Sequence, residues 1–253
     1  MKSESYFGGF QAAALTDIGQ RRRTNQDEVV LEPELGFFAV SDGMGGLAHG
    51  ELASAYVKEA MPLLLRGSLA QAGDTVPEPV EAAETLRSVT AYLSDRLYAE
   101  TNTAGTVMGA TLTGVWLVRD KAVFVSLGDS RAYLLPRRRK KIRQITEDMN
   151  VAGVLLRDGL ITPEEAKTHP GSSCLTAFVG MPAPAEPQIR ICDIHRGDRI
   201  LLCSDGLYGM VPEEELAPLL RSGRSAERVC AALIESANRY GGRDNISAVY
   251  IRL

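Results

Sequence analysis

Hydrophobic residues along this chain follow two kinds of spacing, which divide it into strands and helices. Continuous or alternating apolar runs are typical of strands, and they predict strands at 6–16, 29–32, 36–40, 108–119, 122–127, 132–135, 142–146, 189–193, 199–203 and 246–252. Apolar residues three and four positions apart predict helices at 47–65, 81–100, 151–158, 163–167, 212–221 and 226–240. We expect Pro62 to kink or shorten the first helix, and residues 66–79 to form a loose connection.

Strands and helices occur in blocks rather than in strict alternation. This order favours an α+β fold, with antiparallel sheets and helices packed outside them. Residues 147–180 differ from their surroundings because two short helical patterns interrupt the run of strands. We interpret this segment as a small flap within one domain that spans residues 1–253, since the chain has no internal repeat and no second domain pattern.

Composition indicates the expected compartment and excludes some partners, but it does not indicate which chemistry the protein carries out. The chain has 253 residues and a formal charge of −4, which gives no case for binding nucleic acid. It has no signal-peptide pattern, and no apolar run approaches the ~18 residues of a membrane span. We therefore expect a cytoplasmic protein that is not membrane-bound. Its four cysteines lack CxxC spacing, which favours buried free thiols in a reducing compartment over disulfides or a metal site.

One stretch of this pattern carries candidate chemistry. The apolar run at 37–40 leads into Asp42, which is followed by three glycines within four residues. Asp-Gly is a common turn dipeptide, but Asp205, Asp129 and Asp244 also stand beside apolar strand patterns. If these four carboxylates converge, they repel one another and need bound cations. Aspartate, backbone carbonyl and water suit Mg²⁺ or Mn²⁺ better than zinc.

Two basic segments each allow two interpretations. Arg21, Arg22 and Arg23 stand next to an Asn-Gln-Asp sequence and form either a solvated turn or a place where one arginine grips a phosphate through its planar fork. Residues 137–141 have the sequence Arg-Arg-Arg-Lys-Lys. They form either a solvated hairpin tip or a docking patch for acidic or phosphorylated partners.

Taken in order, the motifs of this chain resemble those of the metal-dependent protein phosphatases, the PPM or type 2C serine/threonine phosphatases, and most closely those of the compact bacterial members. The matching segments are 16–19 with Arg22, 25–27, 41–46, 108–112, 128–133, 160–162, 165–166, 169–170, 175–176 with Gly180, 204–207 and 244–245. Each motif is short, but the ordered set is highly specific and spans essentially the whole chain.

The resemblance implies a four-layer α-β-β-α sandwich, with two antiparallel sheets between helix pairs and a two-metal site at one end. On the family pattern, Asp42 bridges both metals and Gly43 offers its backbone carbonyl. Asp205 and Asp244 hold one of the metals. Asp129 corresponds to the ligand of a third, weaker metal, which it shares with Asp205.

Three more residues receive roles from the resemblance. Arg22 corresponds to the arginine that holds the substrate phosphate. Gln26 stands where many members carry a glutamate, so Gln26 and Asp27 are expected to act on the second metal indirectly, through water.

The implied activity is hydrolysis of phosphoserine and phosphothreonine in proteins, with two Mn²⁺ or Mg²⁺ ions per chain. A metal-bridging hydroxide attacks phosphorus in line, and no covalent phosphoenzyme forms, so no cysteine need be a nucleophile. The implied partners are phosphorylated proteins, the targets of a serine/threonine kinase, and the enzyme is expected to be a monomer.

The chain departs from the family in places that bear on proton transfer and substrate choice. Met44 replaces a histidine that some eukaryotic members carry, so metal-bound water is the candidate acid. Leu47 replaces a histidine of many bacterial members, and we interpret the nearby His49 as a helix-start residue rather than a catalytic one. Met149 and Ser173 replace residues common in the flap.

Three alternatives stay open from the residues. The first is a degenerate phosphatase kept as a binding module, although all four aspartates are present. The second is the related branch that dephosphorylates anti-sigma-factor antagonists. The third is a non-catalytic cation-binding sandwich, which would not need Arg22 beside the acidic motifs.

Overall fold

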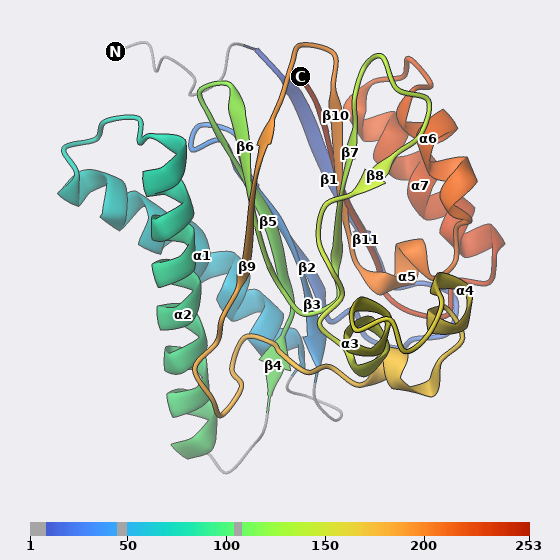
Figure 1. The fold of residues 1–253 in the computed structure, drawn as a ribbon, viewed down its shortest axis with the longest axis horizontal. Coiled ribbons are helices and arrows are strands. Elements are labelled where there is room, and N and C mark those ends of the chain that lie inside the picture. The colour runs from blue at the N-terminus through green and yellow to red at the C-terminus, as the bar shows by residue number, and fades with distance from the viewer. Residues whose placement is uncertain (1–8, 45–49, 104–107) are drawn as a thin grey trace.

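Two antiparallel β-sheets face each other at the centre of the protein, with helices outside both (Figure 1). The structure is a computed structural model and describes residues 9–44, 50–103 and 108–253. The four-layer sandwich expected from the sequence is confirmed. None of the helices in these ranges is long and apolar enough to cross a membrane.

Each sheet combines strands from distant parts of the chain. The five-stranded sheet has the order β1 (Gln11–Asp17), β11 (Ile246–Arg252), β10 (Arg199–Cys203), β7 (Arg131–Leu135) and β8 (Arg143–Gln144). The six-stranded sheet has the order β2 (Asp27–Glu32), β3 (Phe37–Met44), β5 (Leu112–Val118), β6 (Lys121–Leu127) and β9 (Gln188–Asp193), and β4 (Gly109–Ala110) pairs with β3.

Helices cover the outer face of each sheet. The six-stranded sheet carries α1 (Gly50–Gln71) and α2 (Pro79–Thr103), and the five-stranded sheet carries α5 (Asp205–Tyr208), α6 (Glu213–Leu220) and α7 (Ala226–Arg239). Residues 147–180 contain α3 (Val151–Arg157), α4 (Pro163–Ala166) and a 3₁₀ helix, η1 (Pro170–Ser173). That they act as a flap stays a prediction.

The apolar pattern of strand β3 explains why the candidate site lies at the end of this strand. Successive side chains of a strand point to opposite faces, and Phe37 packs under α1 and α2 while Phe38 packs between the sheets. Both faces of β3 are therefore buried, which is why its sequence is continuously apolar. The strand becomes polar at Ser41 and Asp42, where it leaves the core.

Two local predictions were wrong. Helix α1 continues past Leu65 to Gln71, through Pro62, so residues 66–71 are not a loose connection. The reason is tertiary packing, since Leu65 and Leu69 are buried against the six-stranded sheet. The predicted strand 108–119 is interrupted at Thr111, which separates β4 from β5. The short helix α5 lies in a stretch that is compatible with a helix but to which we assigned none.

Candidate metal centre

Four aspartates meet at the end of the sandwich where β3 and β10 leave the core (Figure 1). Asp27 begins β2 and lies directly opposite Asp42 of β3 in the antiparallel register. Asp205 is the first residue of α5, immediately after β10, and Asp244 precedes β11. Because β10 and β11 are neighbours in their sheet, the fold brings both of these carboxylates to the pair from β2 and β3.

The carboxyl groups are close enough to perturb each other's ionisation. Burial raises the pKa of Asp42 well above its ordinary value, and the charges of Asp27 and Asp205 raise it further. The pKa of Asp205 is also raised, first by burial and then by the charge of Asp244. Two carboxyl groups this close are favourable only when they share a proton or a cation.

Neighbouring polar side chains hold the Asp27 carboxylate and the Asp42 backbone in place. Ser204 donates a hydrogen bond of 2.7 Å to Asp27 Oδ2, and Ser204 Oγ in turn accepts one from the Ser247 N–H. Thr111 Oγ1 accepts from the Asp42 N–H at 2.9 Å. The Asp27 carboxylate and the Asp42 backbone therefore cannot move without breaking buried hydrogen bonds.

Asn245 fastens the loop that carries Arg22. Its Nδ2 donates to the carbonyl oxygens of Ile18 and Thr24, and its Oδ1 accepts from the Gln26 N–H at 2.9 Å. At Gly19, φ is +77° and an added Cβ would lie 2.1 Å from the Asp244 carbonyl oxygen. Only glycine allows the loop to approach the Asp244 backbone this closely.

Arg22 pairs with a carboxylate of the cluster. Its Nη2 lies 2.6 Å from Asp244 Oδ2, and the Arg22 side chain is 52% exposed while that of Asp244 is 33% exposed. The guanidinium therefore lies at the rim of the cluster, with one face open to solvent. The nearby Asn245 N–H donates to Asp244 Oδ1 at 2.8 Å, so both oxygens of Asp244 have partners.

Gly43 lies where the backbones of β3 and α1 converge. Its N–H donates to the Gln26 carbonyl oxygen at 3.0 Å, and an added Cβ would lie 2.0 Å from the Gly50 carbonyl oxygen. No other residue fits here without moving the start of α1. Gln26 is therefore held next to Gly43 through its own backbone.

Asp129 lies beside this cluster and belongs to a second network. Asn150 Nδ2 donates to Asp129 Oδ2 at 3.2 Å, and Tyr208 Oη donates to the Asp129 carbonyl oxygen at 3.0 Å. Burial raises the pKa of Asp129 to about 7, and the charge of Asp205 contributes next. Arg131 stacks over the Tyr208 ring, 3.7 Å from its centre, and forms a bidentate pair with Asp148.

The donor set fits a hard divalent cation. It consists of carboxylate and backbone oxygens, and Asp27 Oδ1 and Asp205 Oδ1 are buried without a hydrogen-bond partner. Within the described ranges, no three His, Cys, Asp or Glu side chains are already arranged around one ion position.

The predicted site residues therefore come together in the structure, although their roles are a separate matter. Asp42, Asp205, Asp244, Asp27 and Asp129 form one electrostatic cluster. Arg22, Gly43 and Gln26 border it. Leu47 and His49 lie outside the described residues.

Sequence reasoning missed the residues that hold the acidic segments in place through hydrogen bonds. Thr111, Ser204 and Asn245 stood inside matched motifs without a role, so their position next to an aspartate or strand end was an available signal. Asn150 caps α3 as well as binding Asp129. Nothing in the local pattern indicated its contact with a residue twenty-one positions away.

Comparison with known proteins supplies the family context. The family model described as protein phosphatase 2C matches residues 20–247. The serine/threonine phosphatase stp of Listeria welshimeri is 35% identical over 242 residues, which cover 93% of each chain. Among solved structures, the serine/threonine phosphatase of S. agalactiae has a TM-score of 0.85 at 29% identity and covers 97% of this chain and 100% of that one.

A second solved structure bears on the metals. The catalytic domain of the serine threonine protein phosphatase PstP, in complex with 2 manganese ions, has a TM-score of 0.81 at 31% identity. The match covers 96% of this chain and 97% of that one.

Proposed function

Since this chain belongs to the protein phosphatase 2C family and is a serine/threonine protein phosphatase, we propose that it transfers the phosphoryl group of phosphoserine and phosphothreonine directly to water. The substrates would be phosphorylated proteins, the targets of a serine/threonine kinase. No phosphorylated side chain would form on the enzyme. The observation that carries the proposal is the convergence of Asp42, Asp205 and Asp244 from separate strand ends into one partly buried acidic cluster.

Asp42, Asp205 and Asp244 would hold two divalent cations, with the Gly43 carbonyl as a further oxygen donor. Gln26 and Asp27 would contribute through water. Asp129 would hold a third, weaker cation, with Asp205 beside it. When bound, Mn²⁺ or Mg²⁺ would lower the pKa of the attacking water and offset charge on the phosphoryl oxygens. Like charges buried together are stable only with such counter-ions.

Arg22 would hold the substrate phosphate. It is half exposed at the rim of the cluster and already offers its guanidinium to an anionic oxygen of Asp244. A phosphate is a better partner for the planar fork, because two parallel N–H···O bonds can form. Transfer of Arg22 from Asp244 to the substrate would also free an oxygen of Asp244 for a cation.

The test is turnover by the purified protein. With Mn²⁺ or Mg²⁺ it should hydrolyse an aryl phosphate and a phosphothreonine peptide, and an excess of EDTA should abolish both activities. Protein that binds Mn²⁺ tightly without turnover would contradict the proposal and support a phosphatase fold kept as a binding module. Activity that is indifferent to EDTA would contradict the metal assignment itself.

A further inference from the structure

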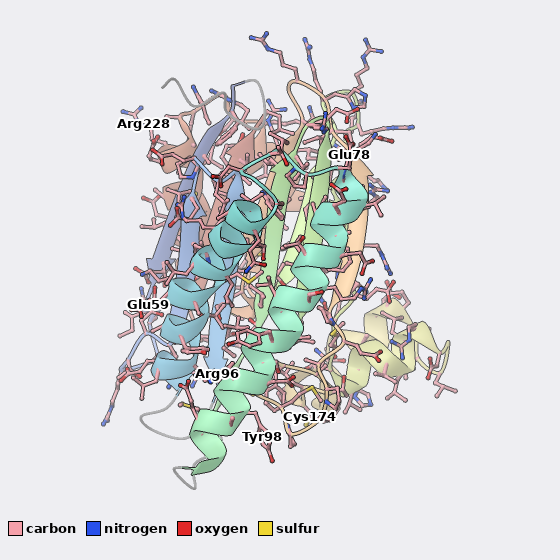
Figure 2. All side chains as sticks on the ribbon, turned by 90° about the vertical axis from the view of Figure 1, so that its left-hand side faces the viewer. Glu59, Glu78, Arg96, Tyr98, Cys174 and Arg228 are labelled. Carbon is pink, nitrogen blue, oxygen red and sulfur yellow. The ribbon has the colours of Figure 1, made fainter. Side chains whose placement is uncertain are left out.

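The turn between β7 and β8 concentrates positive charge at the end of the sandwich remote from the acidic cluster. It carries Arg137, Arg138, Arg139, Lys140 and Lys141, which we call the basic tip, and all five are exposed. In Figure 1 this turn and the β9–β10 turn stand at the upper end, whereas α5 and the end of β3 lie below. Figure 2 shows several side chains ending in nitrogen that project beyond this end.

The charge of the basic tip is not neutralised locally. Within the described ranges, none of its five cations forms an ion pair with a carboxylate. The carboxylate that contacts the turn is Asp198, and its side chain is only 6% exposed. Its oxygens accept hydrogen bonds from the N–H groups of Arg137 and His195, at 2.7 and 2.9 Å. The exposed surface is therefore cationic on a protein whose formal net charge is −4.

The backbone of the basic tip is held in one arrangement. Arg221, which follows α6, donates to the carbonyl oxygens of Pro136, Arg137 and Arg139. The Arg137 side chain packs on Gly197, where an added Cβ would lie 2.7 Å from its Cδ. A simple solvated hairpin tip does not need to be fastened by a neighbouring guanidinium. Because the backbone is ordered beforehand, a ligand of the tip would lose less entropy on binding.

From this arrangement we propose that the basic tip is a docking site for an acidic segment of a protein partner, separate from the metal centre. Three of its five cations are arginines, whose planar forks pair with carboxylates in bidentate fashion. A partner bound there would leave the catalytic end uncovered. If the partner is also a substrate, tethering would raise the effective concentration of its phosphorylated residue.

The surroundings of the tip favour an acidic protein segment over other polyanions. None of the large exposed hydrophobic residues belongs to the described stretches 136–142 or 194–199. Single-stranded nucleic acids bind through aromatic stacking platforms, and membrane-surface segments insert apolar side chains. Neither feature is present in these two stretches. Carboxylates need only the exposed cations that the tip provides.

The test is fluorescence anisotropy of a labelled peptide of alternating glutamate and glycine, with the full chain at low salt. The variant R138Q/K140Q removes two tip cations that make no described side-chain contact. The matched control R228Q/K167Q removes one exposed arginine and one exposed lysine elsewhere, so both variants change the net charge equally. We expect the tip variant to weaken peptide binding by about fivefold, as two exposed charge pairs imply, and the control to change it by less than about twofold.

Two outcomes would overturn the proposal. Equal weakening in both variants would mean that the peptide responds to overall charge and not to the tip. Tighter binding of vesicles containing phosphatidylserine, lost in the tip variant, would assign the surface to membranes instead. Hydrolysis of an aryl phosphate should be the same in the tip variant and the parent, so failure of docking is distinguishable from failure of catalysis.

Discussion

Like charges gather at both ends of the sandwich, but they are largely buried or half-buried at one end and fully exposed at the other. Asp42 and Asp205 of the acidic cluster are partly buried, and burial raises the pKa of both carboxyl groups. The basic tip faces solvent, where mutual repulsion is weakened by water and salt. Burial therefore makes a counter-ion necessary at the acidic end, whereas exposure makes a partner optional at the basic end.

The two ends also differ in how they are supported. At the acidic end, the Asp27 carboxylate accepts a hydrogen bond from Ser204, the Asp244 carboxylate accepts one from the Asn245 N–H, and the Asp42 N–H donates to Thr111. The basic tip is held through its backbone by Arg221, and the Arg138 and Lys140 side chains make no described side-chain contact. Substitutions at the acidic end should thus change chemistry, and substitutions at the basic tip should change association alone.

The largest effect is expected for Asp205→Asn. The amide keeps the shape but loses one negative charge from the cluster, so turnover of an aryl phosphate in Mn²⁺ should fall by about a hundredfold or more. The metal-free variant should unfold at a higher temperature than the parent, because one source of repulsion is gone. The exposed Asp193 on β9 provides the control, and Asp193→Asn should leave turnover unchanged. Normal turnover in Asp205→Asn would show that Asp205 is not a metal ligand.

The stability of the metal-free protein should depend on pH. The pKa of Asp129 is raised to about 7 from 3.8, so folding favours its protonated form. That contribution is complete below about pH 4 and is lost as the pH rises through about 7. Metal-free protein should therefore melt at a lower temperature at about pH 8 than at about pH 5.5.

The gain from the metal follows from linkage. Mn²⁺ at about a hundred times its dissociation constant should add about 2.7 kcal/mol of stability, which corresponds to a rise of about 5–10 °C in Tm for a chain of this size. Differential scanning fluorimetry with and without Mn²⁺ measures it. A gain that is absent at about pH 8 would contradict the view of the cluster as a cation site.

Arg22→Ala should raise KM for the aryl phosphate by about tenfold with a smaller change in kcat, because a phosphate grip acts before the chemical step as well as during it. Arg21→Ala is the matched control from the same loop. Titration with Mn²⁺ should give a dissociation constant no weaker than that of the parent, since Asp244 is released. An unchanged KM in Arg22→Ala would indicate that Arg21 or Arg23 holds the substrate phosphate instead.

The smallest effect is expected at the other end. R138Q/K140Q should change the free energy of unfolding by less than about 0.5 kcal/mol, as is usual for surface substitutions. Urea denaturation monitored by circular dichroism measures this change. A loss of several times that size would mean that these side chains support the fold, and the contrast between the two ends would fail.

The sequence was sufficient where a local pattern has one structural outcome. Apolar runs that end in aspartate predicted strands of both sheets, with a carboxylate at the end of each strand. The reason is that a strand buried on both faces must become polar where it leaves the core. It was insufficient where distant neighbours decide. Leu69 extends α1 past the predicted end only because the six-stranded sheet lies beneath it. The pairing of Arg131 with Asp148 likewise depends on a chain reversal that no local spacing encodes.

Anomalous diffraction from a crystal grown with Mn²⁺ tests the central claim most directly. The account predicts two strong manganese peaks between Asp42, Asp205 and Asp244, with Arg22 turned away from Asp244 toward solvent. Manganese found elsewhere, or no peak near Asp42 while the crystalline protein is active, would contradict it.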